Sequence, residues 1–156
     1  MTRAAFVFVR KSGAPLPTGS AGHVGWGFTT GSGTILAGST ENRSGHPWVN
    51  AGDDNGAWVV EFADQAALVQ DITADGDRHP AYDGLKTLTV RAPQPAAAEA
   101  YARTTPQLGY SALGNNCLDH VHHVLTAYGE QGLPWPQTHP SPNEWFALLI
   151  GEYRTL

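Results

Sequence analysis

The segment 110–129 joins a polar turn to an amphipathic helix, and it holds the only cysteine of the chain. Apolar residues at helical spacing predict a helix that begins near Cys117, and Gly129 is well suited to end it. Cys117 is therefore expected at a helix N-terminus. The unpaired N–H groups and the positive dipole end there favour a thiolate, which is the nucleophilic form of cysteine. The simpler alternative is a free cysteine that packs as a small apolar residue.

Strands are expected mainly in the first half of the chain, and helices mainly in the second. Alternating or apolar runs predict strands at Ala4–Arg10, Gly22–Thr29, Thr34–Thr40, Trp58–Phe62 and Gly84–Val90. Further helices are predicted at Gln65–Ile72, at Pro95–Arg103, and from a Ser141–Glu144 capping box through Leu149. This order indicates an α+β fold, an antiparallel sheet packed against helices, in one domain spanning 1–156.

The net charge, the cysteine count and the apolar runs of the sequence argue against several functional classes. The net charge is −5 and no basic patch is present, which argues against nucleic acid as a partner. A single cysteine cannot form an internal disulfide. The apolar run Ala4–Val9 is too short to span a membrane and lacks a signal-peptide cleavage site, so we expect no membrane insertion and a cytoplasmic location. No cofactor is expected.

Among seven histidines, His23 is the preferred partner for Cys117. On its predicted strand, large apolar side chains alternate with His23 and two glycines, which should leave room beside the imidazole. A surface histidine on a sheet face is the simpler alternative. His120, three residues after Cys117, is the second candidate base. His46, His79 and His139 lie in predicted loops, where structural or solvent-exposed roles are expected.

A cysteine nucleophile also needs a polar group that orients the imidazole, and donors for the oxyanion. Glu41 and Ser39 follow the strand that should pair with the His23 strand, and strand alternation does not decide between them. The backbone N–H groups at the helix start, together with Asn116 and Tyr110, are candidates for binding the substrate or the oxyanion.

Two motifs in this order, Gly22-His23-Val24-Gly25-Trp26 and Tyr110-x4-Asn115-Asn116-Cys117, resemble the circularly permuted papain-like cysteine hydrolases. These form the permuted branch of the NlpC-type superfamily, which includes the lecithin–retinol acyltransferase-like proteins. The resemblance covers about 6–128 and implies Cys117 as nucleophile, His23 as base and a polar third residue on the next strand. The corresponding stretch here, Ile35–Ala37, is apolar, so Glu41 and Ser39 both remain candidates.

The resemblance implies a cysteine-dependent hydrolase or acyl transferase that acts on an amide or peptide bond, with a peptide, a protein or a small acyl or amide compound as substrate. A non-catalytic binding module on the same fold is the first alternative. An acyltransferase or thioesterase for a lipid or small-molecule acyl group is the second. A metal-binding protein that uses the cluster Asp119–His123 is the third, although no zinc-binding spacing accompanies these residues.

Overall fold

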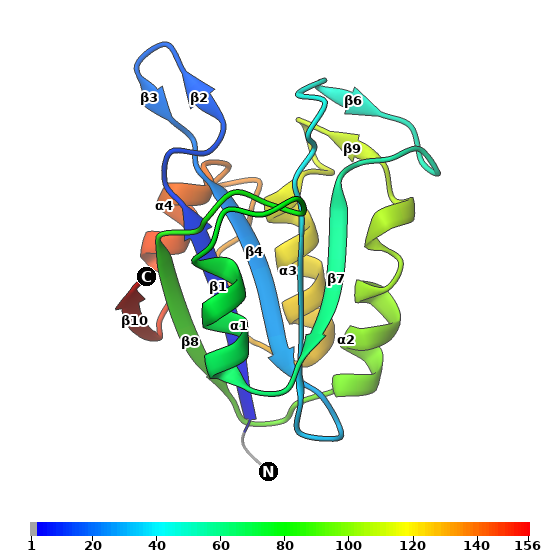
Figure 1. Cartoon of the computed structure of the whole chain (residues 1–156), viewed down its shortest axis with the longest axis vertical. Coiled ribbons are helices and arrows are strands. Elements are labelled where there is room, and N and C mark those ends of the chain that lie inside the picture. Colours follow the sequence, from blue (N-terminus) through cyan, green and yellow to red (C-terminus); the bar gives the residue numbers. More distant parts are fainter. Residues whose placement is uncertain (1–2) are drawn as a thin grey trace.

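A computed structural model describes residues 3–156, and its centre is a six-stranded antiparallel sheet (Figure 1). The strands of this sheet are β1 (Arg3–Arg10), β4 (His23–Thr29), β5 (Ile35–Thr40), β7 (Ala57–Phe62), β8 (Gly84–Val90) and β10 (Glu152–Thr155). Their spatial order is β10-β8-β1-β4-β5-β7. The helices are α1 (Gln65–Ile72), α2 (Pro95–Ala102), α3 (Cys117–Tyr128) and α4 (Pro142–Leu148), with a 3₁₀ turn, η1 (Thr105–Gln107). The predicted α+β class with an antiparallel sheet is confirmed.

Both faces of the sheet are buried, because alternate side chains of its central strands enter two separate apolar clusters. Val7 and Val9 of β1 belong to the cluster that packs against α2, α3 and α4. Phe6 and Phe8 point to the opposite face, where α1 covers them. At about 25 cal/mol per Å² of buried apolar surface, these two clusters supply the main driving force for the fold.

The helix α3 begins at Cys117, as predicted, and its first turn is held by a capping box. The Asn116 side-chain oxygen accepts hydrogen bonds from the N–H groups of Leu118 and Asp119, at 3.0 and 3.2 Å. The Asp119 carboxylate accepts from the Asn116 N–H at 3.0 Å. Gly129, in the left-handed conformation with φ 99°, ends the helix. The local sequence thus fixes where the helix starts and therefore where the thiol lies.

The strand pairing brings three charged or polar residues into one row at an end of the sheet. β1 and β4 pair Arg10 with His23. β4 and β5 pair Trp26 with Gly38 and Thr29 with Ile35. Glu41 directly follows β5, and its Oε2 lies 3.3 Å from His23 Nε2 and 2.7 Å from Arg10 Nη2. Arg10, His23 and Glu41 therefore lie side by side at this end of the sheet.

Two small two-stranded sheets stand beyond this end of the large sheet (Figure 1). One is a hairpin of β2 (Pro15–Leu16) and β3 (Gly19–Ser20), and the other pairs β6 (Trp48–Val49) with β9 (Tyr110–Ser111). The pair β6–β9 was not predicted, since its two strands are far apart in the sequence. It attaches the long 41–55 loop to the turn that precedes Cys117.

The C-terminal part differs from the prediction in two ways. The chain continues after α4 into the edge strand β10, which was not predicted because its side chains are exposed and show no apolar alternation. The capping box predicted at the start of the last helix is wrong, because the Ser141 hydroxyl donates to the Ala21 carbonyl instead, at 3.0 Å. Within residues 3–156, no helix is long and apolar enough to cross a membrane.

Candidate active site

The structure brings Cys117 and His23 together at the end of the sheet where β4 and α3 both begin (Figure 1). The helix α3 packs along β4, so its first residue lies next to the first residue of the strand. Both residues are 7% exposed. The charge of each side chain shifts the pKa of the other, so the two groups lie close to one another. The fold thus brings together two residues that are far apart in the chain.

The surroundings favour the charged forms of both side chains. Burial alone would raise the pKa of Cys117, but the charge of His23, a hydrogen bond to His23 and a backbone hydrogen bond from Val24 lower it below its ordinary value. Burial alone would lower the pKa of His23, but the charge of Cys117 and its hydrogen bonds to Cys117 and Glu41 raise it to about 9. These shifts favour a thiolate beside an imidazolium over a neutral thiol beside a neutral imidazole.

On its other side, His23 contacts both candidates for the third residue. Its Nε2 lies 2.7 Å from Ser39 Oγ and 3.3 Å from Glu41 Oε2. The Ser39 hydroxyl donates to the Val24 carbonyl at 3.2 Å, so it accepts from His23 Nε2–H. With Nε2 occupied in this way, Nδ1 is the ring nitrogen left for Cys117.

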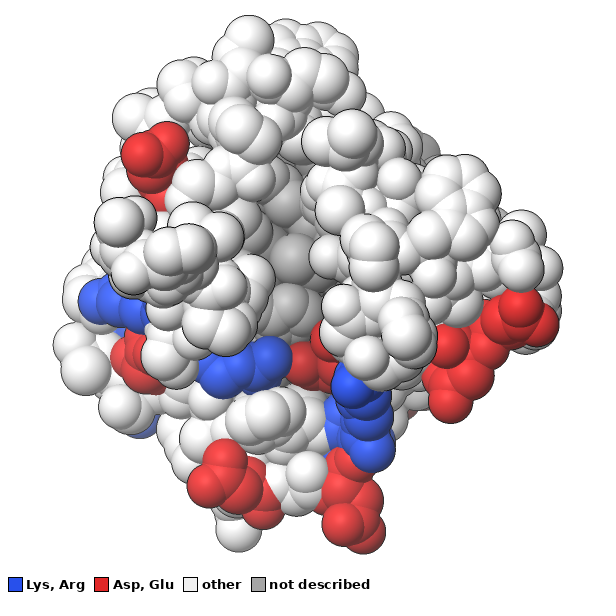
Figure 2. Space-filling view, turned by 90° about the horizontal axis from the view of Figure 1, so that it is seen from above, with Lys and Arg blue, Asp and Glu red and all other residues white. Residues whose placement is uncertain are grey.

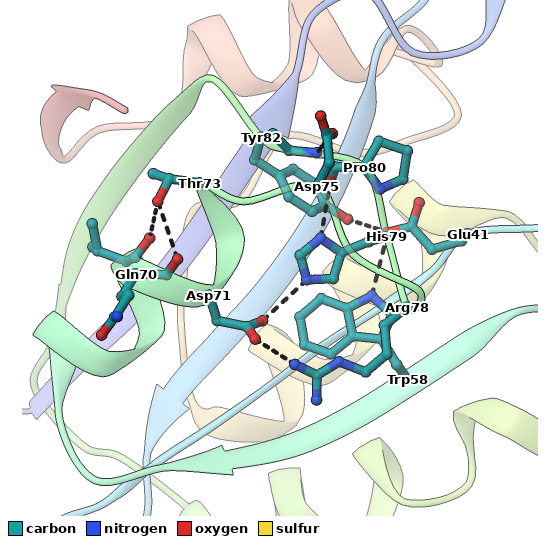
Figure 3. A network of polar contacts seen from close by, with 12 residues as sticks. Glu41, Trp58, Gln70, Asp71, Thr73, Asp75, Arg78, His79, Pro80 and Tyr82 are labelled. Atoms are coloured by element: carbon teal, nitrogen blue, oxygen red, sulfur yellow. Dashed lines mark hydrogen bonds and ion pairs between the residues drawn. The ribbon is translucent and has the colours of Figure 1, made fainter.

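Glu41 is held from several sides, and its side chain is only 2% exposed. Its Oε2 lies 2.7 Å from Arg10 Nη2. Its Oε1 accepts from Trp58 Nε1 at 3.3 Å and from the Tyr82 hydroxyl (Figure 3). Burial would raise the pKa of Glu41, but the hydrogen bond and charge of His23, with the hydrogen bonds of Tyr82 and Arg10, hold it well below the usual range. Glu41 is thus an ionised, fully partnered carboxylate.

The glycines beside His23 do not leave open space, as the strand pattern had suggested. A Cβ added at Gly25 would lie 2.0 Å from Phe8 Cε2, so the Phe8 ring already fills this position. The Tyr82 ring lies 5.9 Å from the imidazole, centroid to centroid. The aromatic packing restricts the orientation of His23, which suits a residue that must exchange a proton at a fixed place.

His120, the second candidate base, has both ring nitrogens against residues other than Cys117. Its Nδ1 lies 2.6 Å from Thr40 Oγ1, and its Nε2 lies 2.6 Å from Asn115 Oδ1. Burial and the charge of His123 lower the pKa of His120 to about 4, so the ring is neutral near pH 7. His120 therefore links α3 to β5 and to the turn before Cys117.

Two groups beside Asn116 can donate to an oxyanion near the thiol. The Asn116 oxygen caps α3, and one N–H of its side-chain amide donates to the Ala112 carbonyl at 3.2 Å, so this side chain is held by the helix start and the preceding turn. The Cys117 N–H has no acceptor among residues 3–156. Tyr110 is half-buried, and burial together with the charge of Cys117 raises its pKa to about 12, so it remains a phenol that can donate.

Seen from the end of the molecule that carries the two small sheets, the surface is hollowed, and charged side chains of both signs lie along one edge of the hollow (Figure 2). A cavity of about 800 Å³ lies on the Glu41 side of the site. Its lining comprises Arg10, Glu41, Asn42, Arg43, Gly76, Asp77, His79 and Pro80. A cavity of about 290 Å³ lies against the first turn of α3, between Leu113 and Pro136. Glu41 thus lines the first cavity and Asn116 the second, so each cavity adjoins a neighbour of the cysteine–histidine pair.

The histidine-rich part of α3 does not assemble a metal site in the described part of the chain. No three His, Cys, Asp or Glu side chains converge there in a way that could hold an ion. Asp119 closes the capping box, and His122 stacks on Trp135 at 5.2 Å. His123 Nδ1 lies 3.0 Å from the Tyr101 hydroxyl.

Sequence reasoning missed Arg10, Trp58 and Tyr82, which surround Glu41. Arg10 ends the first strand, and a cation at the end of an apolar strand ordinarily indicates only solvent exposure. Tyr82 lies in a segment without regular secondary structure. Neither Arg10 nor Tyr82 therefore carries a local sequence signal for this role.

Comparison with known proteins gives no assignment: no protein-family model, curated protein or solved structure matches this chain.

Proposed function

We propose that this protein is a cysteine-dependent hydrolase or acyl transferase that acts on an amide or peptide bond, on a permuted papain-like architecture. The observation that carries the proposal is the arrangement around His23. One side of the imidazole faces a cysteine at a helix N-terminus, and the other contacts Ser39 and Glu41. This is the constellation that activates a thiol as a nucleophile.

The first half of the reaction forms an acyl-enzyme. The Cys117 thiolate attacks the carbonyl carbon of the substrate, and the electron pair of the C=O bond moves to oxygen. The Cys117 N–H and the Tyr110 hydroxyl stabilise this oxyanion. His23 donates its Nδ1 proton to the leaving nitrogen, the C–N bond breaks, and a thioester on Cys117 remains.

The second half releases the acyl group. Neutral His23 takes a proton from water, or from an acceptor amine or alcohol, and the resulting nucleophile attacks the thioester carbonyl. Collapse of the second tetrahedral intermediate breaks the C–S bond and restores the thiolate beside the imidazolium. Ser39 and Glu41 keep His23 Nε2 protonated and fixed in both halves, so that Nδ1 alone exchanges protons.

An extended polypeptide suits the approach to this site best. The strand pairs β2–β3 and β6–β9 lie on either side of it (Figure 1), and they carry the exposed apolar side chains Leu16 and Trp48. The hollow at this end of the molecule (Figure 2) suits a chain segment whose apolar side chains contact these two residues. We therefore place peptide and protein amides before lipid acyl groups as substrates.

The near-complete burial of Cys117 favours a second candidate, a binding module on the same fold that performs no chemistry. In this case the hollow at this end of the molecule holds a partner, and Cys117 and His23 only stabilise the local structure. A Cys117→Ala variant that keeps partner binding and biological function would favour the module over the enzyme.

The direct test measures alkylation of Cys117 by iodoacetamide against pH, in the parent and in His23→Ala. We expect a midpoint clearly below the ordinary value of ~8.5 in the parent, and at or above it in the variant, because the buried thiolate loses its cation. An ordinary midpoint that is indifferent to His23 would refute the proposed site. Mass spectrometry after incubation with amide, ester and thioester probes then identifies the acyl group that Cys117 accepts.

A further inference from the structure

Arg10 lies next to the site but outside the group of residues that exchanges protons. Its guanidinium is fixed at two points: Nη2 lies 2.7 Å from Glu41 Oε2, and Nη1 donates to the Pro80 carbonyl at 3.2 Å. The side chain is only 14% exposed. A long cationic side chain held in this way has lost the freedom of an ordinary surface arginine.

The same residue belongs to a clamp on the Glu41 carboxylate. The guanidinium packs over the Tyr82 ring, 4.9 Å from its centroid, and the Tyr82 hydroxyl donates to Glu41 Oε1. Trp58 donates to the same oxygen (Figure 3). With donors on both oxygens, the carboxylate cannot turn away from His23 without breaking several hydrogen bonds.

The four ionisable groups alternate in charge along their contacts, from the Cys117 thiolate through the His23 imidazolium and the Glu41 carboxylate to the Arg10 guanidinium. Alternation matters because charges interact strongly where water is excluded. Loss of one member leaves its neighbour as a buried charge without compensation. Arg10 is the only member of the four that no step of the proposed reaction uses.

We propose that Arg10 is a positioning residue, which holds Glu41 ionised and in contact with His23 and thereby keeps the Cys117 thiolate populated near neutral pH. This role rests on the cysteine–histidine pair of the proposed function. In agreement with it, the hydrogen bond to Arg10 is among the influences that lower the pKa of Glu41 against the effect of burial.

Other ionisable groups near this row are few. Tyr82 contacts both Arg10 and Glu41, and Tyr110 is near Cys117. The cavity beside Glu41 is lined in addition by Arg43, Asp77 and His79. These three stay unchanged in the variants below, so differences between the variants report on Arg10 and Glu41.

The test is the pH profile of Cys117 alkylation by iodoacetamide in Arg10→Met and Arg10→Lys. Cys117 is the only cysteine, so the mass of the labelled protein reports this one thiol. We expect Arg10→Met to move the midpoint to higher pH, with about tenfold slower alkylation on the acid side. Arg10→Lys keeps the positive charge and stays close to the parent. A profile of Arg10→Met that superimposes on the parent, or one of Arg10→Lys displaced as far as that of Arg10→Met, overturns the role.

A second comparison asks whether Arg10 acts through Glu41. The double variant Arg10→Met/Glu41→Gln should be alkylated at a rate within about twofold of that of Glu41→Gln alone, because the carboxylate that Arg10 contacts is absent from both. An effect as large as in the parent background overturns the inference, since Arg10 would then act on the thiolate without Glu41.

Near-UV circular dichroism and thermal melting check that each variant is folded. Should Arg10→Met not fold, Arg10→Gln carries the same test, because it removes the charge but keeps a donor for Glu41. Alkylation needs no turnover, so the result is separate from hydrolysis. If His23→Ala leaves the profile unchanged, the proposed function fails; if His23→Ala shifts it and Arg10→Met does not, only the role of Arg10 fails.

Discussion

Among single residues, Gly25 affects the surroundings of His23 because it leaves space for the Phe8 ring. Gly25 lies two positions after His23 on the same face of β4, and the Phe8 ring occupies the space that a side chain there would need. Phe8 also contacts the Tyr82 ring edge to face, with 4.6 Å between centroids. Tyr82 in turn donates a hydrogen bond to Glu41. The position of the Phe8 ring therefore influences, through Tyr82, the carboxylate that contacts the imidazole.

We therefore expect Gly25→Ala to destabilise the protein. The added Cβ would overlap Phe8, and overpacking of this kind costs about 1–3 kcal/mol. Gly31→Ala is the matched control, because an added Cβ there meets nothing within 4 Å, and the change should stay within about 0.5 kcal/mol. Urea unfolding measures both. A Gly25→Ala variant as stable as Gly31→Ala would mean that Phe8 can move aside freely.

At the scale of secondary-structure elements, α3 performs two tasks at its first turn. The capping box formed by Asn116 and Asp119 stabilises the helix start, and the free Cys117 N–H stays available. The link from His120 to Thr40 then fixes the helix against β5. The position of the thiol is thus set by one local and one long-range interaction.

Substitutions at Asn116 should separate helix capping from thiol reactivity. Asn116→Ala removes the cap and should cost about 1 kcal/mol of unfolding free energy. Asn116→Asp keeps the cap but adds a negative charge beside the thiolate, so it should raise the pKa of Cys117 while stability is retained. Asn116→Ser, a neutral cap, is the control for both. Urea unfolding and alkylation against pH give the two readouts; equal profiles for the Asp and Ser variants would argue against an electrostatic effect at this position.

At the scale of the whole molecule, the sheet is the scaffold that gathers the site from distant parts of the chain. Arg10 and His23 come from β1 and β4, Glu41 directly follows β5, and Cys117 begins a helix that comes much later in the chain. The side chains of Arg10, His23 and Glu41 are at most 14% exposed. The stability of the molecule is therefore coupled to the ionisation of these groups.

This coupling predicts how the free energy of unfolding depends on pH. The pKa of Glu41 is lowered in the folded protein from its ordinary value of 4.5, so its contribution is fully present above about pH 4.5 and declines as the pH falls further. Glu41→Gln leaves Arg10 and His23 without their carboxylate and should be less stable at pH 6. The difference in unfolding free energy between the parent and Glu41→Gln should become smaller below pH 4.5, by at most about 1.4 kcal/mol per pH unit. Thermal melts at several pH values measure this difference. A difference that stays constant down to pH 3 would contradict the lowered pKa of Glu41.

The local features of this protein can be predicted from its sequence alone. Helical periodicity and the terminal Gly129 placed α3, and the turn before it put Cys117 at the first helical position. Strand alternation placed β4, with His23 on the face that carries the small residues. These features depend on hydrogen bonds and periodicities within a few residues, which a sequence displays directly.

What surrounds these residues depends on the tertiary structure. Strand pairing placed Arg10 beside His23, and the folded chain brought Ser39 and Glu41 to the same ring nitrogen. The Phe8 ring filled the space that the glycines were expected to leave open. Such contacts arise between segments far apart in the chain, where pairing and packing choose among many arrangements that the local pattern leaves equal. The chemistry of the site therefore depends on long-range geometry, although its nucleophile is apparent in a short stretch of sequence.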